Sequence, residues 1–296
     1  MPRGFGERFI DAWPTADPVP WGEAVLSLAL PPRPVRLLGL DERQRNWLGE
    51  RYRFRAGGAG AGPALRLWRV ASEGFRQRGG ERQEYSLDLY HDPEELWVAG
   101  WQFLARLPWS GEALAEIWTC ETERGAFLGV VENVLRILTA RRVLARGGVV
   151  IHSAGLQIDA RAHLFWGYSG AGKSTLSRLA LAAGHGVISD DLNVVLPGPG
   201  GFIVERVPFA GDLGQTDAST GPLPLGGLHR LLKATEDRRE PLAPARALAS
   251  LSACAPFVNV DPHRTEQLLD NLAVLLKATT VDSVYFSPTG NPWSLF

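Results

Sequence analysis

The stretch GYSGAGKST, at residues 167–175, decides the fold of this chain. It fits the pattern G-x-x-x-x-G-K-[ST], in which small residues let successive backbone N–H groups turn inward around an anionic phosphate. We therefore predict a nucleotide-phosphate site. Lys173 would neutralise charge on the β and γ phosphates, and the hydroxyl of Ser174 would contact Mg²⁺. The nucleotide-binding residues predicted from the pattern are Gly167, Tyr168, Ser169, Gly170, Ala171, Gly172, Lys173, Ser174 and Thr175.

The flanking sequence supports this interpretation, because a loop of this kind lies between a strand and a helix. The preceding run AHLFW, at 162–166, is apolar and aromatic, as expected of a strand. The following run TLSRLALAAG, at 175–184, repeats apolar residues at helical spacing and ends at a glycine. The positive end of that helix dipole would face the phosphates. The alternative, a glycine-rich connection in an unrelated α/β domain, leaves the Lys-Ser-Thr ending unexplained.

Two further sequence features concern the predicted nucleotide-phosphate site. In HGVISDDLNVV, at 185–195, the acidic pair Asp190 and Asp191 interrupts a β-branched run, as expected where a strand delivers carboxylates to the phosphate side of a sheet. One carboxylate would hold Mg²⁺ through water and the other would accept a proton from an attacking hydroxyl. A solvated loop is the alternative for an isolated acidic pair. His152, in the strand-like run VVIHSAGL, is by itself more typical of a core residue or a strand-end residue.

Taken together, these features resemble the catalytic core of HPr kinase/phosphorylase and its relatives, which share a fold core with phosphoenolpyruvate carboxykinases. The histidine, the loop, the pair Gly184-His185 and the two aspartates occur in the same order between about residues 130 and 215. The resemblance implies that Ser174 coordinates Mg²⁺, that Asp190 and Asp191 supply a metal contact and the catalytic base, and that His152 lies near the transferred phosphoryl group. Glu205, in VERVPFAG, is the loose counterpart of a metal-binding glutamate in the family.

Departures from the bifunctional enzyme narrow the expected activity. Thr175 follows the loop serine where that enzyme has a glutamate, and the segment linked to its phosphorylase activity is not recognisable. The chain looks closer to HPr-kinase-like proteins of bacterial gene clusters, some of which phosphorylate a ribosomally made peptide and others free serine. We expect a kinase that uses ATP and Mg²⁺ and acts on a hydroxyl, most plausibly serine of a peptide, protein or small molecule. The alternatives are a nucleotide-binding regulator or an ATPase without phosphoryl transfer. The resemblance also implies a homo-oligomer.

The composition limits which classes of protein and which binding partners are compatible with the chain. The chain has 296 residues, 45% of them hydrophobic, and a net charge of −1, so it can bury a sizeable core and has no overall basic field for nucleic acid. Cys120 and Cys254 are far apart in the sequence, which argues against a disulfide framework and favours a reducing compartment. There is no segment of signal-peptide type and no run of roughly 18 apolar residues. We expect a cytoplasmic protein without a membrane or nucleic-acid partner.

The expected fold class is α/β, with a P-loop kinase core built on a mixed sheet at 126–296 and a smaller N-terminal α+β region at 1–125. Eight of the ten tryptophans precede residue 120, among stretches that alternate as antiparallel strands do. Packing in the core of a small sheet is the favoured use of these rings, and a surface that recognises the acceptor is the alternative. In the N-terminal region we expect strands at 64–71, 84–90 and 96–104 and a glycine-rich loop at 56–62. In the rest of the chain we expect helices at 126–145, 244–253 and 264–278, a strand or short helix at 228–234, and a strand near 281–288. The loop expected at 211–227 is either an active-site lid or a plain connector.

Overall fold

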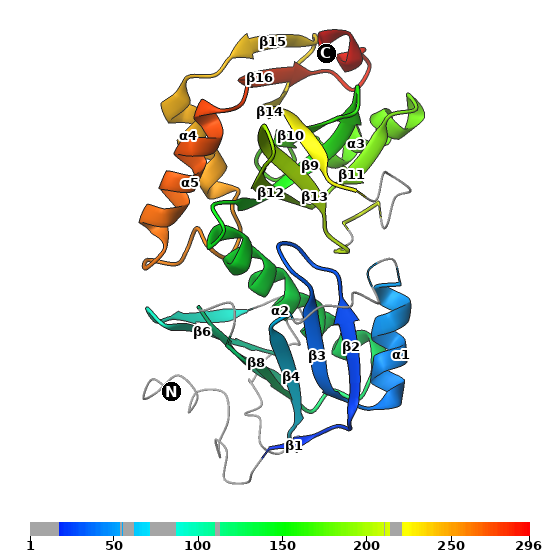
Figure 1. Ribbon diagram of the computed structural model, residues 1–296. Coiled ribbons are helices and arrows are strands. Elements are labelled where there is room, and N and C mark those ends of the chain that lie inside the picture. The colour runs from blue at the N-terminus through cyan, green and yellow to red at the C-terminus, as the bar shows by residue number, and fades with distance from the viewer. Residues whose placement is uncertain are drawn as a thin grey trace. The chain divides into compact units, whose positions relative to one another are not determined.

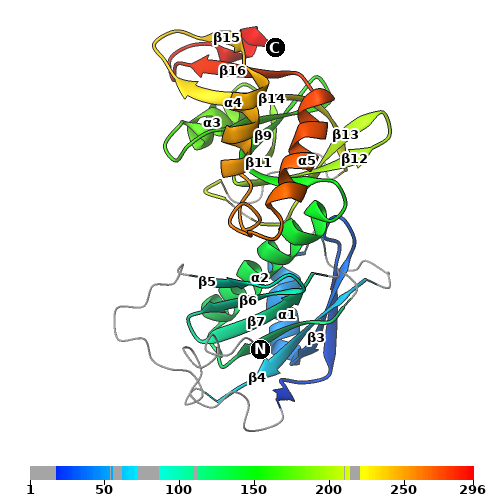
Figure 2. The same cartoon turned by 90° about the vertical axis from the view of Figure 1, so that its left-hand side faces the viewer.

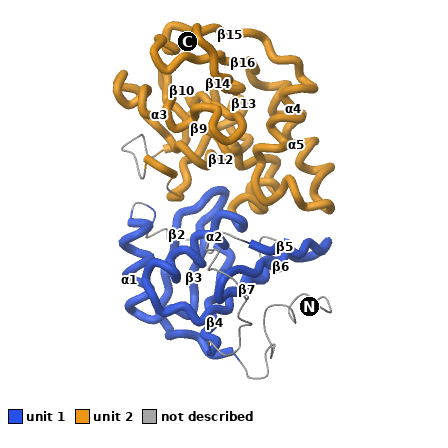
Figure 3. Tube along the Cα trace, turned by 180° about the vertical axis from the view of Figure 1, so that it is seen from behind, with its two compact units in different colours: residues 1–138 blue, residues 139–296 orange. Residues whose placement is uncertain are grey.

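The computed structural model describes residues 18–53, 55, 62–71, 87–109, 113–209, 211–213 and 221–296. It is a mixed α/β structure in which the described residues form five α-helices and two sheets of eight strands each. The chain divides into two compact units, Met1–Leu138 and Thr139–Phe296 (Figure 3). No helix among the described residues has the length and apolar character needed to cross a membrane.

Unit 1 contains the first sheet, whose strands are ordered β2-β3-β4-β8-β7-β6-β5, with β1 paired to β4 (Figure 1). The strands are β1 (Val19–Pro20), β2 (Ala24–Leu28), β3 (Val35–Leu40), β4 (Ala64–Arg69), β5 (Asp88–His91), β6 (Glu95–Gly100), β7 (Phe103–Pro108) and β8 (Ala115–Thr119). The expectation of an antiparallel strand at 64–71 is wrong, because β4 pairs in parallel with both β3 and β8. In the other two stretches, β5, β6 and β7 pair antiparallel, as expected.

The stretch expected as one strand at 96–104 is instead the hairpin of β6 and β7. Gln102, in its turn, has a φ of 52°, which an extended strand does not allow. Buried Trp97 and Trp118 stack with ring centroids 6.0 Å apart, so these two tryptophans pack in the core, as favoured from the sequence. Residues 56–61 of the predicted glycine-rich loop and residues 84–86 of the predicted strand lie outside the described residues.

Two helices complete unit 1. In α1 (Glu42–Arg51), Asp41 caps the first turn: its carboxylate accepts from the N–H of Gln44 at 2.7 Å, and Gln44 Oε1 accepts from the Asp41 N–H at 3.1 Å. The second helix, α2 (Arg124–Leu144), confirms the helix predicted at 126–145. The division between the two units falls inside α2, whereas the sequence placed a boundary before it.

Unit 2 contains the second sheet, ordered β10-β9-β12-β13-β14-β16-β15, with β11 paired to β9. A parallel pairing of β10 with β14 closes the first five of these strands into a ring. The strands are β9 (Val149–Ile158), β10 (Arg161–Trp166), β11 (Gly186–Ser189), β12 (Leu192–Gly198), β13 (Gly201–Arg206), β14 (Leu223–Lys233), β15 (Arg238–Pro241) and β16 (Val281–Phe286). The predicted mixed sheet is confirmed, since β14 pairs in parallel with β10 and β16 and antiparallel with β13.

Helices cover both sides of this sheet. The helix α3 (Lys173–Ala182) lies on one side, and α4 (Pro244–Ala253) and α5 (Thr265–Lys277) lie together on the other (Figures 1 and 2). On the α3 side, Phe165, Leu176 and Phe286 belong to one buried apolar cluster, against which residues of the short 3-10 helix η3 (Pro292–Leu295) also pack. The predicted helices at 244–253 and 264–278 and the strand near the C-terminus are confirmed. Residues 228–234 resolve to a strand, and β14 extends back into the predicted loop at 211–227, of which 214–220 lie outside the described residues.

Candidate phosphate-binding and catalytic site

The glycine-rich loop leaves β10 after Trp166 and enters α3 at Lys173, which is the strand-to-helix setting expected of a phosphate loop. The Ala171 N–H closes a turn onto the Tyr168 carbonyl at 3.0 Å. Gly172 has a φ of 105°, and a Cβ added there would approach the Phe286 ring to 2.7 Å. Both the backbone conformation and the space available therefore require glycine at the start of α3.

Lys173 begins α3 and turns its side chain back over the loop. Its Nζ donates to the carbonyls of Gly167 at 3.0 Å and Tyr168 at 3.4 Å. Burial lowers the pKa of Lys173, while the nearby Cys254 and Asp191 act in the opposite direction. No side chain caps the N-terminus of α3. The loop thus combines an ammonium group with an uncapped helix N-terminus, the combination that attracts a phosphate.

The predicted acidic pair lies between β11 and β12, and its two members have different surroundings. Asp190 is 6% exposed, and its Oδ2 accepts a hydrogen bond from the Leu213 N–H at 3.0 Å. Gly211 lies so close to this carboxylate that a Cβ there would overlap it. Asp190 therefore holds residues 211–213 against the turn between β11 and β12.

Asp191 lies instead beside His152. The pairing of β9 with β12 sets Leu192 opposite His152, and the Ser153 N–H donates to the Asp191 carbonyl at 3.0 Å. His152 Nε2 lies 3.6 Å from Asp191 Oδ1, close enough for electrostatic attraction but too long for a hydrogen bond. The two side chains are 49% and 22% exposed, so a substrate can approach both.

A buried amide fixes the backbone that carries these groups. The Asn193 side chain is fully buried and donates through Nδ2 to the Ser153 carbonyl at 2.7 Å and to Ser153 Oγ at 3.0 Å. Gly155 on β9 makes room for it, since a Cβ there would overlap the Asn193 amide. Asn193 thus ties the strand of His152 to the strand that follows Asp191.

Asp212 is a site residue that the sequence analysis did not single out. Ser174 Oγ donates to Asp212 Oδ2 at 3.3 Å, so a third carboxylate lies at the predicted metal-binding serine. The hydrogen bond between Asp190 and Leu213 holds the segment that presents it. The only signal in the sequence was an acidic residue inside the stretch expected to lie beside the active site.

Arg230 also lies beside the loop, as one of the basic residues after 211–227 that the sequence allows to reach phosphate, with a solvated surface as the favoured alternative. The parallel register of β10 and β14 sets Arg230 opposite Trp166, the last residue before the loop. Burial raises the pKa of the Cys254 thiol, and Lys173, the Gly167 N–H and Arg230 oppose that rise. Arg230 therefore adds positive charge beside the loop. Its neighbour His229 is fully buried in the sheet and does not reach this site.

Glu205, the loose counterpart of a family metal ligand, lies on β13. It pairs with Val194 on β12. Val194 is three residues past Asp191, which corresponds to roughly 10 Å of extended strand. Asp212, and not Glu205, makes the hydrogen bond to Ser174.

The donor set fits Mg²⁺ that arrives with a nucleotide. The described residues contain no group of three or more His, Cys, Asp or Glu side chains that could hold a metal ion. Nucleotide-bound Mg²⁺ needs only one or two protein oxygens, because phosphate and water supply the rest. The Ser174 hydroxyl and the Asp212 carboxylate are oxygen donors of that kind.

Two comparisons with known proteins found no relative of this chain. No protein-family model matches the chain, and a search of curated proteins found no significant match.

Proposed function

We propose that this protein is a Mg²⁺-dependent kinase of the HPr-kinase-like P-loop type, which transfers the γ-phosphoryl group of ATP to a hydroxyl. The acceptor in this proposal is serine of a peptide, a protein or a small molecule. The observation that carries the proposal is the loop between β10 and α3, over which Lys173 Nζ lies 3.0 Å from the Gly167 carbonyl; the partly exposed Asp191 carboxylate beside His152 supports it. A phosphate-binding lysine and a partly exposed carboxylate thus share one site.

The residues have separate roles in the proposed reaction. Lys173, the loop N–H groups and the N-terminus of α3 bind the β and γ phosphates. Ser174 and Asp212 would hold Mg²⁺, which would offset the negative charge that develops during transfer. Arg230 would add a positive charge beside the same loop.

Asp191 is the proposed base. Its carboxylate accepts the acceptor's hydroxyl proton as that oxygen bonds to the γ phosphorus and the bond from the γ phosphorus to the β–γ bridging oxygen breaks, so that ADP leaves. In the proposal, His152, which lies 3.6 Å from Asp191, stabilises the transferring phosphoryl group. Asp190 acts indirectly, because its carboxylate is committed to the Leu213 N–H.

The decisive experiment combines binding with transfer. We expect calorimetry to show Mg²⁺-dependent binding of ATP, and γ-labelled ATP to deliver label to free serine or to a serine-containing peptide. Lys173→Ala should lower the transfer rate by about 10²- to 10³-fold, the loss typical of a contact that stabilises transition-state charge. Lys233→Ala, which removes an exposed lysine at the end of β14, is the matched control.

Three outcomes contradict the proposal. Absence of ATP binding would show that the loop is not a nucleotide site. Release of free phosphate without a labelled acceptor would indicate an ATPase, and tight ATP binding without turnover would indicate a regulator. The same preparation tests assembly, since light scattering should show the homo-oligomer that we propose. Cys120 and Cys254 are present as thiols, which fits the cytoplasmic setting that belongs to this proposal.

A further inference from the structure

Residues 292–296, which form η3 and the residue after it, pack against the apolar cluster on the α3 side of the second sheet. Three of their side chains are partly buried in this contact: Trp293, Leu295 and Phe296. The cluster itself includes Phe165 of β10 and Leu176 of α3, the two elements that flank the glycine-rich loop. The segment 292–296 therefore shares one apolar cluster with both flanks of the loop, although it is far from them in the sequence.

Phe296 contacts β10 close to the loop. Its ring lies edge-on to the ring of Phe165, with centroids 5.5 Å apart, and to the ring of His229, with centroids 4.9 Å apart. Edge-to-face contacts between aromatic rings are favourable and directional, so they fix the rings relative to one another. Phe165 is fully buried and lies two residues before Gly167, where the loop begins. Phe296 therefore holds the strand from which the loop leaves.

Trp293 contacts the other flank of the loop, at the far end of α3. Its ring centroid lies 4.7 Å from that of His185. The His185 N–H donates to the Ala180 carbonyl at 2.9 Å, so His185 belongs to the turn that ends α3. Leu179 of α3 packs against the same apolar cluster as Trp293. Trp293 therefore holds the C-terminal end of the helix that the loop enters.

Arg239 of β15 anchors the segment 292–296. Its Nη1 donates to the Leu295 carbonyl at 3.1 Å, and its guanidinium carbon lies 5.1 Å from the centroid of the Phe296 ring. The guanidinium is itself fixed, because its Nε donates to Asp282 Oδ2 at 2.6 Å. Figure 1 shows the C-terminal turn next to β15 and β16. The segment is therefore hydrogen-bonded to the sheet as well as packed on it.

The apolar cluster reaches the loop through Phe286 of β16. This buried side chain belongs to the cluster, and a Cβ added to Gly172 of the loop would lie 2.7 Å from its ring. Protein interiors are close-packed, so removal of one side chain from a cluster lets its neighbours shift. Filling the core is the simpler role for the segment 292–296, but that role does not require contacts with both flanks of the loop.

We propose that Phe296 and Trp293 are positioning residues, which keep the loop at 167–172 in its observed conformation by holding β10 and the end of α3. Loss of either contact lets the loop sample other conformations. Binding of ATP must then order the loop, which weakens the binding. The effect on ATP rests on the proposed function, whereas the effect on the loop itself does not.

Hydrogen exchange, followed by mass spectrometry on the full chain without nucleotide, tests the effect on the loop. The exchange rate of the amides at 168–174 is divided by that of the β9 amides in the same variant, because a global loss of stability raises both rates. We expect Phe296→Ala to raise this exchange ratio at least about tenfold and Trp293→Ala to raise it about threefold, as expected when local opening becomes easier. Phe296→Tyr keeps the ring and should leave the ratio unchanged.

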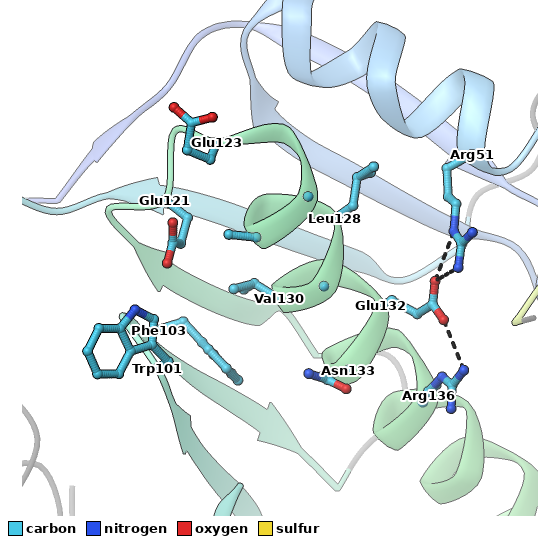
Figure 4. A pocket seen from close by; sticks show the side chains of 13 residues that line it. Arg51, Trp101, Phe103, Glu121, Glu123, Leu128, Val130, Glu132, Asn133 and Arg136 are labelled. Carbon is cyan, nitrogen blue, oxygen red and sulfur yellow. Dashed lines mark hydrogen bonds and ion pairs between the residues drawn. The ribbon is translucent and has the colours of Figure 1, made fainter. Parts of the chain in front are cut away.

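Two buried residues outside the cluster serve as controls. Leu272→Ala truncates a fully buried side chain of α5 in unit 2, and Val130→Ala truncates a buried side chain in unit 1, beside the cavity that Figure 4 shows. Both substitutions should lower the melting temperature, as large-to-small changes in a core do. Neither should change the exchange ratio, because neither residue belongs to the cluster.

Calorimetry with Mg²⁺ and ATP tests the consequence for binding. Phe296→Ala should raise the Kd about fivefold, and Phe296→Tyr should not. An unchanged exchange ratio in Phe296→Ala, an equal rise in Leu272→Ala, or faster loop exchange without a change in Kd would each overturn this proposal. If the unsubstituted protein binds no ATP, the proposed function fails, and the exchange ratio alone decides whether the segment positions the loop.

Discussion

Asp190 and Asp191 are adjacent in the sequence and chemically identical, but their environments separate their roles. The Asp190 carboxylate is buried against Gly211 and accepts from the Leu213 N–H. The Asp191 carboxylate is partly exposed and lies beside His152. A catalytic base must reach the acceptor, so in the proposed kinase the accessibility of Asp191 favours it over Asp190 as the base.

This difference predicts unequal effects of the same substitution. Asp191→Asn removes the proposed base and should lower phosphoryl transfer by about 10²- to 10³-fold with little change in ATP affinity. Asp190→Asn keeps an oxygen that can accept from the Leu213 N–H, so transfer should stay within about tenfold of the unsubstituted protein. Rates measured at saturating ATP, together with binding constants, check this. Equal losses in the two variants would assign the base role to neither residue alone.

At the scale of elements, the site depends on how β10 joins α3. The loop has no room for side chains at its end, because Gly172 has a φ of 105° and meets the Phe286 ring of β16. Asn193 on β12 and Gly155 on β9 similarly fix β9 to the strand that follows the aspartates. The geometry of the proposed catalytic groups therefore depends on strands that are distant in sequence.

The geometry of the loop predicts that the same substitution has different effects at two glycines. Gly172→Ala adds backbone strain and a clash with Phe286, and it should lower the free energy of unfolding by about 1 to 3 kcal/mol and weaken ATP binding. Gly184 also has a positive φ, 83°, but a Cβ there meets nothing within 4 Å. Gly184→Ala should therefore show the strain alone and leave ATP affinity unchanged. Urea unfolding and calorimetry measure both effects, and identical behaviour of the two variants would contradict this account of the loop.

At the scale of the whole molecule, α2 belongs to both compact units. Within unit 1, Glu132 of α2 pairs with Arg51 of α1. Within unit 2, Arg141 of α2 makes a buried ion pair with Asp261 at 3.2 Å, and Asn271 Nδ2 donates to the Leu144 carbonyl at 2.8 Å. These side chains explain why the division falls inside the helix, where no composition change marks it.

Unit 2 also contains a row of four interacting polar side chains, one from each of the strands β10, β14, β16 and β15. His163 Nδ1 lies 2.9 Å from His229 Nε2, His229 Nδ1 lies 2.7 Å from Asp282 Oδ1, and Arg239 Nε donates to Asp282 Oδ2 at 2.6 Å. Burial, followed by the charges of His229 and Arg239, lowers the pKa of His163 to about 4, and burial also lowers that of His229. Both imidazoles are therefore neutral in the folded protein near pH 7.

This row of side chains predicts how stability depends on pH. A histidine that protonates near pH 6.5 when unfolded, but only near pH 4 when folded, makes the unfolded state bind more protons between these values. The free energy of unfolding should therefore fall as pH drops from about 6.5 to about 4, by at most about 1.4 kcal/mol per pH unit for each such proton. Urea unfolding at a series of pH values measures the slope.

Two variants isolate the contribution of this row of side chains. His163→Gln should make the slope shallower, because it removes one of the protons concerned. His263→Gln, which replaces an exposed histidine, should leave the slope as it is. The same slope in the protein and in both variants would show that other groups dominate acid destabilisation.

Local sequence was sufficient for most of unit 2. The spacing of apolar residues predicted α3, α4 and α5, because a helix that buries one face must repeat with a period near 3.6. The strand before the loop and the turn that carries Asp190 and Asp191 were also predicted. Strand pairing was harder to predict from the sequence, since parallel neighbours such as β4 and β8 are far apart in the chain and leave no local pattern.

The sequence by itself determined the glycine-rich loop between β10 and α3 that we propose binds phosphate, since its glycines and Lys173 act through backbone geometry that nine consecutive residues specify. Only the tertiary structure decided which groups surround it. Asp212 meets Ser174, Arg230 lies beside Trp166, and Asp191 rather than Asp190 faces His152. The physical reason is that these contacts arise from strand register and burial, which bring together residues that are separated along the chain.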